Sequence, residues 1–400
     1  MLARFAIPCL LLLAGCGTLS EVKTLSSTDS DPINGARVEG YVFQPEKIPA
    51  TDERVAELQA PPGFTVIKYA EDMGKPRMLA ARPDGTVYVS RREGDVYRLR
   101  DTDGDGKADE RTRVFTMKNI HGLALRGDDL YLVAVNEVLK TRLRADGSFG
   151  AVDTVASDFP EGGQHNNRTL AFGPNGKLYV SVGSTCNACK ETNDENATLV
   201  EMNADGSGRR IFARGLRNTI GFDWHPETGT LYGLDHGIDW LGDEAQREEL
   251  NVLEDGNHYG WPYIYENGKY NPADEPDEGF AAFEKTVTGP VLTYTAHSAP
   301  LDMIFYRGDQ FPAEYRNDAI VTLRGSWNRS KPSGYKIVRI AFDDRGNPTE
   351  ITDFVSGWLR NNDRQQMGRL VGLVEMPDGS LLASDDDNGV IYRIAYAGTK

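Results

Sequence analysis

The chain has 400 residues, of which 39% are hydrophobic and 26% are charged. This composition supports a packed globular core and argues against disorder along the whole chain. Sixty acidic residues against 44 basic residues give a net charge of −16. Such a surface repels phosphate backbones, so we expect no nucleic-acid partner, whereas the acidic balance suits the binding of cations such as Ca²⁺.

Residues 1–16 have the pattern of a targeting signal. Arg4 supplies a short positive region, and the apolar run 5–13 is too short to span a bilayer. The run leads into Leu-Ala-Gly before Cys16, which resembles a bacterial lipobox, where the signal is cut before the cysteine and the thiol is lipidated. The alternative is an ordinary secretory signal with a chance cysteine. We predict a periplasm-facing protein that is lipid-anchored to a bacterial membrane, with the outer membrane favoured because Gly17 follows the cysteine.

Two of the four cysteines, Cys186 and Cys189, form a Cys-x-x-Cys pattern. A strong zinc site would need a second cysteine pair, and a thioredoxin-like redox pair would need a βαβ context, and the sequence shows neither. In an oxidising compartment such a pair commonly pins a loop. We therefore predict a local disulfide between these two residues.

The chain after the signal divides into two parts. Residues 17–62 are rich in Ser, Thr, Asp, Glu and Pro, which is typical of a tether with weakly structured ends. Residues 63–400 consist of short β-like runs separated by turn signals. Six of these runs follow a Pro-Asp-Gly turn or a variant of it: 85–90, 129–133, 176–181, 229–234, 318–323 and 379–384.

The starts of these runs are spaced by roughly 40–90 residues, which is the spacing of blades or solenoid repeats. With room for four strands per repeat, the pattern predicts one all-β domain, a six-bladed β-propeller of four-stranded antiparallel blades. We expect the run 65–69 to pair with the last blade, since closing the ring removes free sheet edges. Loops at one end of the central channel would then carry the functional residues.

His165 is the first candidate for catalysis. It lies in a loop just before a predicted strand at Thr169, beside two asparagines and Arg168. Histidine is the side chain best able to take a proton near neutral pH. The alternative is a loop histidine that only satisfies a backbone group.

Two later loops offer a guanidinium and hard oxygen ligands. Arg217 and Asn218 lie at a blade end with glycines on both sides, and a planar guanidinium suits a carboxylate or quinone oxygen. The segment 235–244 offers carboxylates and backbone carbonyls, the ligand set that Ca²⁺ prefers. The alternatives are a structural arginine and a solvated acidic loop.

Further basic residues, Arg324 and Arg369 among them, follow in the segments 324–336 and 364–369. In an acidic protein they indicate an anionic small ligand in the channel, with salt bridges between blades as the alternative.

The segment 101–109, Asp-Thr-Asp-Gly-Asp-Gly-Lys-Ala-Asp, matches the first half of a calcium loop. The twelfth position is Thr112 rather than Glu, so a true EF-hand is not expected. We interpret the segment as a hairpin loop that binds structural Ca²⁺, with the candidate ligands Asp101, Asp103, Asp105 and Asp109.

Taken in order, these segments resemble the glucose/sorbosone dehydrogenase family, and most closely its L-sorbosone and pyranose dehydrogenase branch. The resemblance runs from about residue 63 to the C-terminus. It rests on His165-x-x-Arg168, Gly-Leu-Arg-Asn at 215–218, Asp-Trp-Leu-Gly-Asp at 239–243, Asn-His-Tyr-Gly-Trp-Pro at 257–262, His-Ser-Ala-Pro at 297–300 and Gly-Ser-Trp-Asn-Arg at 325–329. Members of that family are six-bladed propellers that use pyrroloquinoline quinone (PQQ) with Ca²⁺.

The resemblance implies a role for each candidate residue. His165 would be the base that takes the proton from a sugar's anomeric hydroxyl while hydride passes from that carbon to the C5 carbonyl of PQQ, and Arg217 would assist at the quinone oxygen. The implied Ca²⁺ ligands are Gly237 and Ile238, through their carbonyls, and Asp239. The implied cofactor-binding residues are Arg168, Arg217, Asn218, His297, Arg324, Asn328 and Arg369.

Two positions depart from the family branch: Arg324 replaces a usual histidine, and Ile238 replaces a usual arginine before Asp239. Two other classes of function stay open, a metal-dependent lactonase on a similar propeller and a non-catalytic propeller that binds a glycan or a protein. The expected substrate is a small sugar, and the electron acceptor, a quinone or a cytochrome, is not identified by any motif. Contact with the membrane is expected through the lipid anchor alone.

Overall fold

The computed structural model describes residues 23–26, 39–271 and 274–398. Within these ranges the fold is all-β, and its helices are α1 (Asp52–Ala56), α2 (Phe280–Phe283) and the 3₁₀ turns η1 (Glu284–Thr286) and η2 (Ala313–Tyr315). None of the helices in these ranges is long and apolar enough to cross a membrane. The predicted signal 1–16, with the lipidation site Cys16, lies outside the described residues.

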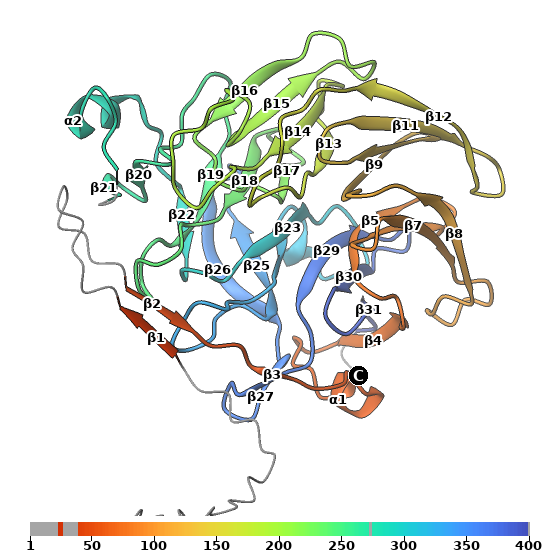
Figure 1. The fold of residues 1–400 in the computed structure, drawn as a ribbon. Helices are drawn as coiled ribbons and strands as arrows, with labels where there is room; N and C mark the ends of the chain where they lie inside the picture. The colour runs from red at the N-terminus through yellow and green to blue at the C-terminus, as the bar shows by residue number, and fades with distance from the viewer. Residues whose placement is uncertain (1–22, 27–38, 272–273, 399–400) are drawn as a thin grey trace, which may run out of the picture.

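Six four-stranded antiparallel sheets surround a common centre, as Figure 1 shows for the described part of the chain. From the inner strand outward, the first three are β5 (Pro76–Ala81), β6 (Val87–Arg91), β7 (Asp95–Arg100), β8 (Glu110–Thr116); β9 (Gly122–Arg126), β10 (Asp129–Val133), β11 (Val138–Leu143), β12 (Phe149–Ala156); and β13 (Leu170–Phe172), β14 (Leu178–Val182), β15 (Thr198–Met202), β16 (Arg210–Arg214). The others are β17 (Phe222–Trp224), β18 (Leu231–Asp235), β19 (Glu248–Val252), β22 (Leu292–Tyr294); β23 (Pro300–Phe305), β24 (Ala319–Leu323), β25 (Lys336–Phe342), β26 (Pro348–Val355); and β29 (Leu370–Glu375), β30 (Leu381–Asp385), β31 (Val390–Tyr396), β4 (Phe64–Ala70). This is the arrangement of a β-propeller.

Each run that the sequence analysis singled out is the second strand of one of these sheets: β6, β10, β14, β18, β24 and β30. These strands are mostly apolar and buried on both faces because each sheet packs between two others, and all five residues of β14 and of β30 are buried. The preceding turn is set locally. In the first sheet Asp84 Oδ1 accepts the N–H of Thr86 at 3.0 Å, and Gly85 adopts a φ of +82°, a conformation that side chains rarely tolerate.

A tyrosine that recurs in the second strands joins neighbouring sheets. The hydroxyl of Tyr88 donates to the carbonyl of Gly147 at 2.7 Å, in the β11–β12 hairpin of the next sheet. The hydroxyl of Tyr232 donates in the same way to Gly346 at 2.7 Å, in the β25–β26 hairpin. Each of these tyrosines is buried, so the bond satisfies a hydroxyl that burial would otherwise leave unpaired.

The ring is closed by strand β4, which pairs antiparallel with β31 and so completes the last sheet with an N-terminal strand. The predicted pairing of residues 65–69 with the last blade is confirmed: Thr65 pairs with Ala395 and Lys68 with Tyr392. The inner strands β29 and β5 also contact each other across the closure.

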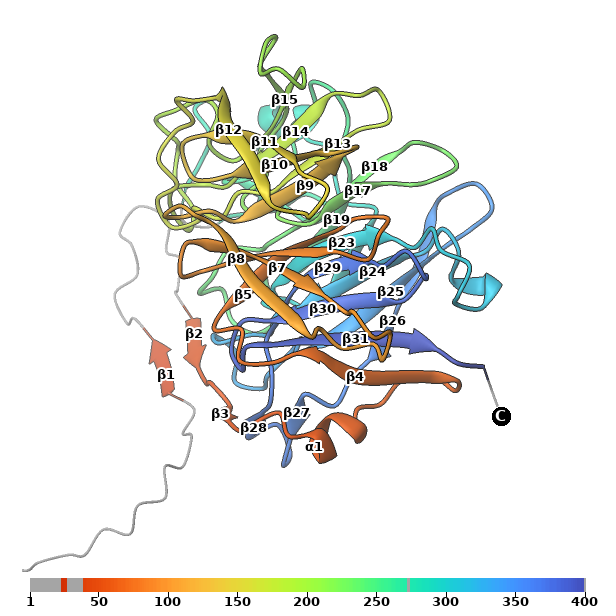
Figure 2. The same ribbon diagram turned by 90° about the vertical axis from the view of Figure 1, so that its right-hand side faces the viewer.

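The smaller sheets lie outside the ring. They comprise β1 (Lys23–Ser26) with β2 (Glu39–Val42), β20 (Ile264–Tyr265) with β21 (Lys269–Tyr270), and β27 (Leu359–Arg360) with β28 (Gln365–Gln366) and β3 (Glu46–Lys47). Residues 39–62, which the sequence analysis assigns to the tether, pack on the propeller. Val55 of α1 is buried in a core cluster with Trp358, and the N–H of Phe43 donates to Trp327 O at 3.0 Å. Figure 2 shows β1, β2 and β3 along one face of the ring.

Candidate functional site

The loops that precede the inner strands meet at one end of the central channel. His121 Nδ1, just before β9, lies 2.9 Å from Arg168 O, just before β13. Thr169 Oγ1 donates to Ile220 O, just before β17, at 2.5 Å. Because these contacts tie the starts of successive inner strands together, the loop residues predicted from the sequence gather at the same end. We call it the near end.

His165 lies at the near end with its ring held at one nitrogen. Nδ1 lies 2.8 Å from Ser184 Oγ and 3.1 Å from Ser184 O. The serine hydroxyl donates its proton to Cys186 O at 2.8 Å, and the carbonyl can only accept, so both partners require a proton on Nδ1. Nε2 then carries the lone pair, and it accepts no hydrogen bond from the described residues.

Burial holds the His165 ring in its neutral form. Desolvation, with Arg217 and His236 as further causes, lowers the pKa of His165 to about 2. A histidine must be neutral to accept a proton, so this environment keeps the base form present across the physiological pH range.

Arg217 is almost fully buried and is held by two partners. Its Nε donates to Asn187 O at 2.9 Å, and its Nη2 donates to Asn187 Oδ1 at 2.9 Å and to Asp239 Oδ2 at 3.2 Å. Burial lowers the pKa of Arg217, and Asp239 opposes that shift. Nη1 donates to none of the described residues, so this nitrogen remains available to a ligand.

Asn218 is oriented by the residues behind it. Asp235 Oδ1 accepts the N–H of Asn218 at 2.7 Å, and Asp235 Oδ2 accepts the N–H of Arg217 at 2.8 Å. His236 Nε2 donates to Pro300 O, which leaves Nδ1 as the acceptor for Asn218 Nδ2 at 3.4 Å. The two carboxylate bonds hold the backbone of the predicted Arg–Asn pair in one position.

The predicted cation loop, residues 237–239, turns its N–H groups toward side chains of the protein. Gly237 N–H donates to Glu248 Oε2 at 3.1 Å, and Ile238 N–H donates to Gln246 Oε1 at 2.9 Å. The carbonyl oxygens of Gly237 and Ile238 accept no hydrogen bond from the described residues. Unpaired carbonyls beside a carboxylate are hard oxygen donors, so this loop fits Ca²⁺.

Asn328 and His297 complete the group around Asp239. Asn328 Nδ2 donates to Asp239 Oδ1 at 2.6 Å and lies 3.4 Å from His297 Nδ1. His297 Nε2 donates to Gly242 O at 3.0 Å. Asp239 therefore receives bonds from both Arg217 and Asn328, and the structure brings together four of the residues predicted for the site.

The arginines of the near end outnumber their carboxylate partners. Arg324 and Arg77 share Asp386, with Arg77 Nη1 at 2.6 Å and Arg324 Nη2 at 3.0 Å from its oxygens. Arg369 donates to the carbonyls of Arg324, at 3.3 Å, and Gly325, at 2.5 Å, and forms no ion pair within the described residues. These three guanidinium groups, of which Arg369 has no ion pair, offer donors to an anionic ligand, and Asp385, whose Oδ1 accepts the Arg369 N–H at 2.8 Å, lies beside them with Asp386.

Two predicted groups lie apart from this cluster. Arg168 is fully buried, and its Nε and Nη2 donate to Val135 O at 2.9 Å and Pro160 O at 2.6 Å, so its side chain braces loops between sheets. In the β7–β8 hairpin, carboxylate oxygens of Asp101, Asp103 and Asp109 lie within 4.8 Å of one another, and Asp105 is outside that group.

Cys186 and Cys189 form a disulfide. Four residues of the near end were not predicted from the sequence: Asn187, Ser184, Arg77 and Asp386. Asp386 follows a second strand in the position that His236 and Arg324 occupy in their sheets. Superposing the six repeats would therefore have pointed to Asp386, whereas no sequence signal marks Asn187.

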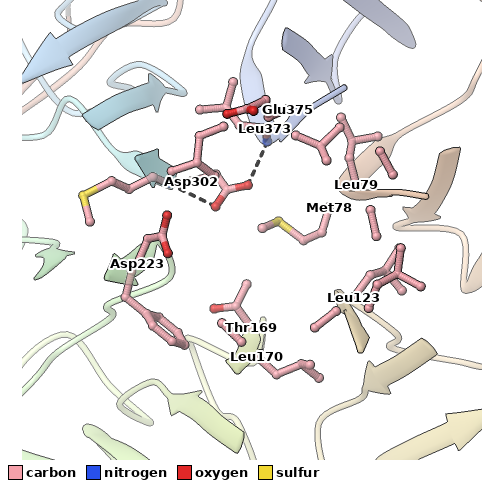
Figure 3. A pocket seen from close by; sticks show the side chains of 18 of the residues that line it. Met78, Leu79, Leu123, Thr169, Leu170, Asp223, Asp302, Leu373 and Glu375 are labelled. Carbon is pink, nitrogen blue, oxygen red and sulfur yellow. Dashed lines mark hydrogen bonds between the residues drawn. The ribbon is translucent and has the colours of Figure 1, made fainter. Parts of the chain in front are cut away.

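A cavity of about 420 Å³, which Figure 3 shows, runs along the inner strands from Thr169 and Ile220 toward Asp223, Arg307 and Glu375, at what we call the far end. Aliphatic side chains such as Leu79, Leu123 and Leu170 form one wall, and Asp223 and Asp302 lie on the other.

The polar groups of this far end are paired with the protein. Asp223 accepts from Arg307 at 2.8 Å and from Phe305 N–H at 2.8 Å. The two oxygens of Asp302 accept the N–H groups of Met303 at 3.0 Å and Leu373 at 2.7 Å. We therefore place the candidate site at the near end, although this cavity is large.

The fold and the near-end cluster define a β-propeller with a neutral histidine, an unpaired guanidinium nitrogen and free carbonyls at one channel mouth. The family model for glucose/sorbosone dehydrogenases matches residues 131–393, and the chain belongs to that family.

Three comparisons illustrate the relationship. An uncharacterized protein of Borreliella burgdorferi is 28% identical over 87% of this chain and 93% of its own. A pyrroloquinoline quinone-dependent pyranose dehydrogenase of Coprinopsis cinerea is 33% identical over 46% of this chain and 31% of its own. The calcium structure of a Trichoderma reesei carbohydrate-active enzyme of family AA12 has a TM-score of 0.76 at 20% identity and covers 87% of this chain and 100% of that one.

Proposed function

We propose that this protein is a six-bladed, PQQ- and Ca²⁺-dependent dehydrogenase that oxidises an aldose or a related sugar at its anomeric carbon. The observation that carries the proposal is the position of three groups at one channel mouth. They are the unprotonated Nε2 of His165, the unpaired Nη1 of Arg217 and the free carbonyls of residues 237–238. Family membership supports the reaction class.

In this proposal His165 Nε2 takes the proton from the anomeric hydroxyl, and Ser184 keeps the ring in the tautomer that can do so. PQQ, when bound, supplies the carbonyl that receives the hydride. Arg217 Nη1 and Asn218 Nδ2 donate to oxygens of the ligand, where negative charge develops during the reaction.

The residues that would hold the cofactor are Arg324, Arg369, Asn328 and His297. Two arginines sharing Asp386, with Arg369 beside them, supply the charge that three carboxylates require. The carbonyls of Gly237 and Ile238, with Asp239, would hold the Ca²⁺. Arg168 Nε and Nη2 are directed to backbone carbonyls, and its Nη1 is buried with no partner among the described residues.

The test is a titration of the metal-stripped protein with PQQ, with and without Ca²⁺, followed by absorbance. We expect saturable binding that requires Ca²⁺, and then reduction of a dye with one or more sugars from an aldose panel. A protein that neither binds PQQ nor reduces dye with any sugar would overturn the proposal.

The lactonase alternative receives no support from the geometry. In the described residues, two groups of possible ligand atoms converge, Cys186, Cys189 and Glu191 in one and Asp101, Asp103 and Asp109 in the other, and the two cysteines of the first are joined in a disulfide. A catalytic carboxylate cluster at the channel centre is absent from these two groups.

We also propose that the protein is a lipoprotein, anchored through Cys16 on the periplasmic side with the outer membrane favoured, and that the loop 101–109 binds a structural Ca²⁺. Incorporation of labelled palmitate that Cys16→Ala abolishes tests the first point. For the second point, we expect Asp101→Asn to melt at a lower temperature than the parent protein in Ca²⁺ and at the same temperature as the parent in EGTA. We propose a quinone or a cytochrome as the electron acceptor, and reduction of one of the two by the sugar-reduced protein tests this.

A further inference from the structure

A loop closed by the disulfide lies beside the candidate site. Residues 186–189 belong to the connection between β14 and β15, and the disulfide joins the first and last of them, whose Cα atoms are 6.2 Å apart. Asn187 lies inside this small ring. The loop is therefore a stiff platform, since the cross-link removes backbone freedom from the residues between the cysteines.

Asn187 makes five hydrogen bonds to two parts of the site and to Trp261. Its carbonyl accepts from Arg217 Nε at 2.9 Å and from Trp261 Nε1 at 3.2 Å. Its side-chain Oδ1 accepts from Arg217 Nη2 at 2.9 Å and from Asp239 N–H at 2.8 Å, and its Nδ2 donates to Asp239 O at 3.2 Å. Asn187 thus contacts Arg217 at two nitrogens, one through its backbone carbonyl and one through its side chain, and its side chain contacts the backbone of Asp239 at two atoms.

The bond to the N–H of Asp239 sets the direction of the carbonyl of Ile238. These two groups belong to one planar peptide unit, in which the N–H and the C=O point in opposite directions. With the N–H directed to Asn187 Oδ1, the Ile238 oxygen points away from the disulfide loop. Gln246 Oε1 acts in the same way on the N–H of Ile238 and hence on the carbonyl of Gly237.

The same loop also supports the base. Cys186 O accepts the hydroxyl proton of Ser184 at 2.8 Å, and this bond makes the serine oxygen an acceptor for His165 Nδ1. The loop 186–189 therefore bonds to Ser184, which holds His165, and directly to Arg217 and Asp239.

We propose that Asn187, presented by the disulfide-closed loop, is a positioning residue that aims the Ile238 carbonyl at the cation and fixes the orientation of Arg217. The inference rests on the proposed function, because it places Ca²⁺ at residues 237–239. It predicts that opening the disulfide weakens cation binding even though neither cysteine contacts the cation.

The experiment measures cation affinity without turnover. Terbium is titrated into the metal-stripped full chain, and its luminescence is sensitised by Trp240, the neighbour of Asp239. All proteins carry Asp101→Asn and Asp103→Asn, so that the acidic hairpin does not contribute signal. Competition with Ca²⁺ then gives the Ca²⁺ dissociation constant for each variant.

Asn187→Ala is expected to weaken Ca²⁺ binding by about 10-fold to 100-fold, the usual cost of losing a residue that orients a metal ligand. Asn187→Asp keeps an oxygen for Arg217 and for the Asp239 N–H but loses the donor to Asp239 O, so it should recover part of the affinity that Asn187→Ala loses. Cys186→Ser with Cys189→Ser should fall between the two. Asn175→Ala, in the β13–β14 hairpin, is the matched control and should bind like the parent protein.

The outcomes separate this inference from the proposed function. Tight binding by the parent protein and equally tight binding by Asn187→Ala would overturn the positioning role alone. Loss of affinity in both Asn187→Ala and Asn187→Asp, with an unfolded circular dichroism spectrum, would assign Asn187 to stability and overturn it as well. A parent protein that binds neither terbium nor Ca²⁺ would overturn the proposed function together with this inference.

Discussion

The two ends of the central channel differ in how their polar groups are paired. At the far end, Asp223 is paired with Arg307, and both oxygens of Asp302 accept backbone N–H groups. At the near end, His165 Nε2 and Arg217 Nη1 have no hydrogen-bond partner among the described residues. The larger space lies at the far end, but the unused bonding capacity lies at the near end. Because buried polar groups are normally satisfied by the protein, unpaired groups mark the chemistry better than volume does.

The largest effect should come from removing the base. His165→Ala is expected to lower kcat by about 10²-fold to 10⁴-fold, because it deletes the acceptor for the hydroxyl proton. PQQ affinity should change little. Steady-state kinetics with the best sugar and a PQQ titration of the same sample check this. If the variant turns over at the parental rate, the assignment of the near end as the reaction site is wrong.

Buried titrating groups at the two ends should give opposite pH dependences of stability. Burial lowers the pKa of His165 to about 2, below its value of about 6.5 in the unfolded chain, so the unfolded state binds more protons and stability falls as the pH drops below about 6.5. Burial raises the pKa of Asp302 to about 7, above about 3.9 in the unfolded chain, so the folded state binds more protons and stability falls as the pH rises from about 4 to 7.

Urea unfolding at pH 4, 5.5 and 7 measures both effects. Relative to the parent, His165→Asn should gain about 1.4 kcal/mol of unfolding free energy per pH unit of acidification below pH 6.5, and Asp302→Asn should gain it as the pH rises. Parallel pH profiles for all three proteins would show that neither group is held away from its ordinary pKa.

A substitution in the paired network of the far end should cost stability and leave catalysis unchanged. Asp223→Ala removes the acceptor of the Phe305 N–H and leaves Arg307 without its partner. The expected loss is about 1–3 kcal/mol of unfolding free energy. Thermal unfolding measures the loss of stability, and steady-state kinetics on the same preparation measures kcat. A tenfold fall in kcat would place a catalytic role at the far end.

The smallest expected effect concerns the tyrosines that join neighbouring sheets. Tyr88→Phe deletes one hydroxyl bond to Gly147 and should cost about 1 kcal/mol, with kcat and PQQ affinity unchanged. A melting curve is sufficient. An unchanged melting temperature would mean that water replaces the lost bond.

Much of the fold could be predicted because its signals are local. Each second strand follows a turn motif and has alternating apolar residues, and both signals lie within about ten residues of sequence. The packing of residues 39–62 on the ring could not be read in this way. Val55 and Phe43 contact Trp358 and Trp327, which lie far along the chain, and the composition of the segment resembles that of a tether.

The site was predicted in part. Arg217, Asp239, His297 and Asn328 do meet, whereas Arg168 directs its Nε and Nη2 to backbone carbonyls of other loops. Side-chain direction depends on which neighbouring loop offers an acceptor, and sequence spacing does not report it.

The sequence by itself determined the repeated strands, the closing strand and the set of residues able to do the chemistry. Only the tertiary structure decided which of those residues are paired and which are unpaired. Asn187 and Asp239 are 52 residues apart, in loops of neighbouring sheets, and they meet because the ring brings successive loops to one channel mouth. A hydrogen bond is short-ranged and directional, so its partner is defined only after the sheets have packed.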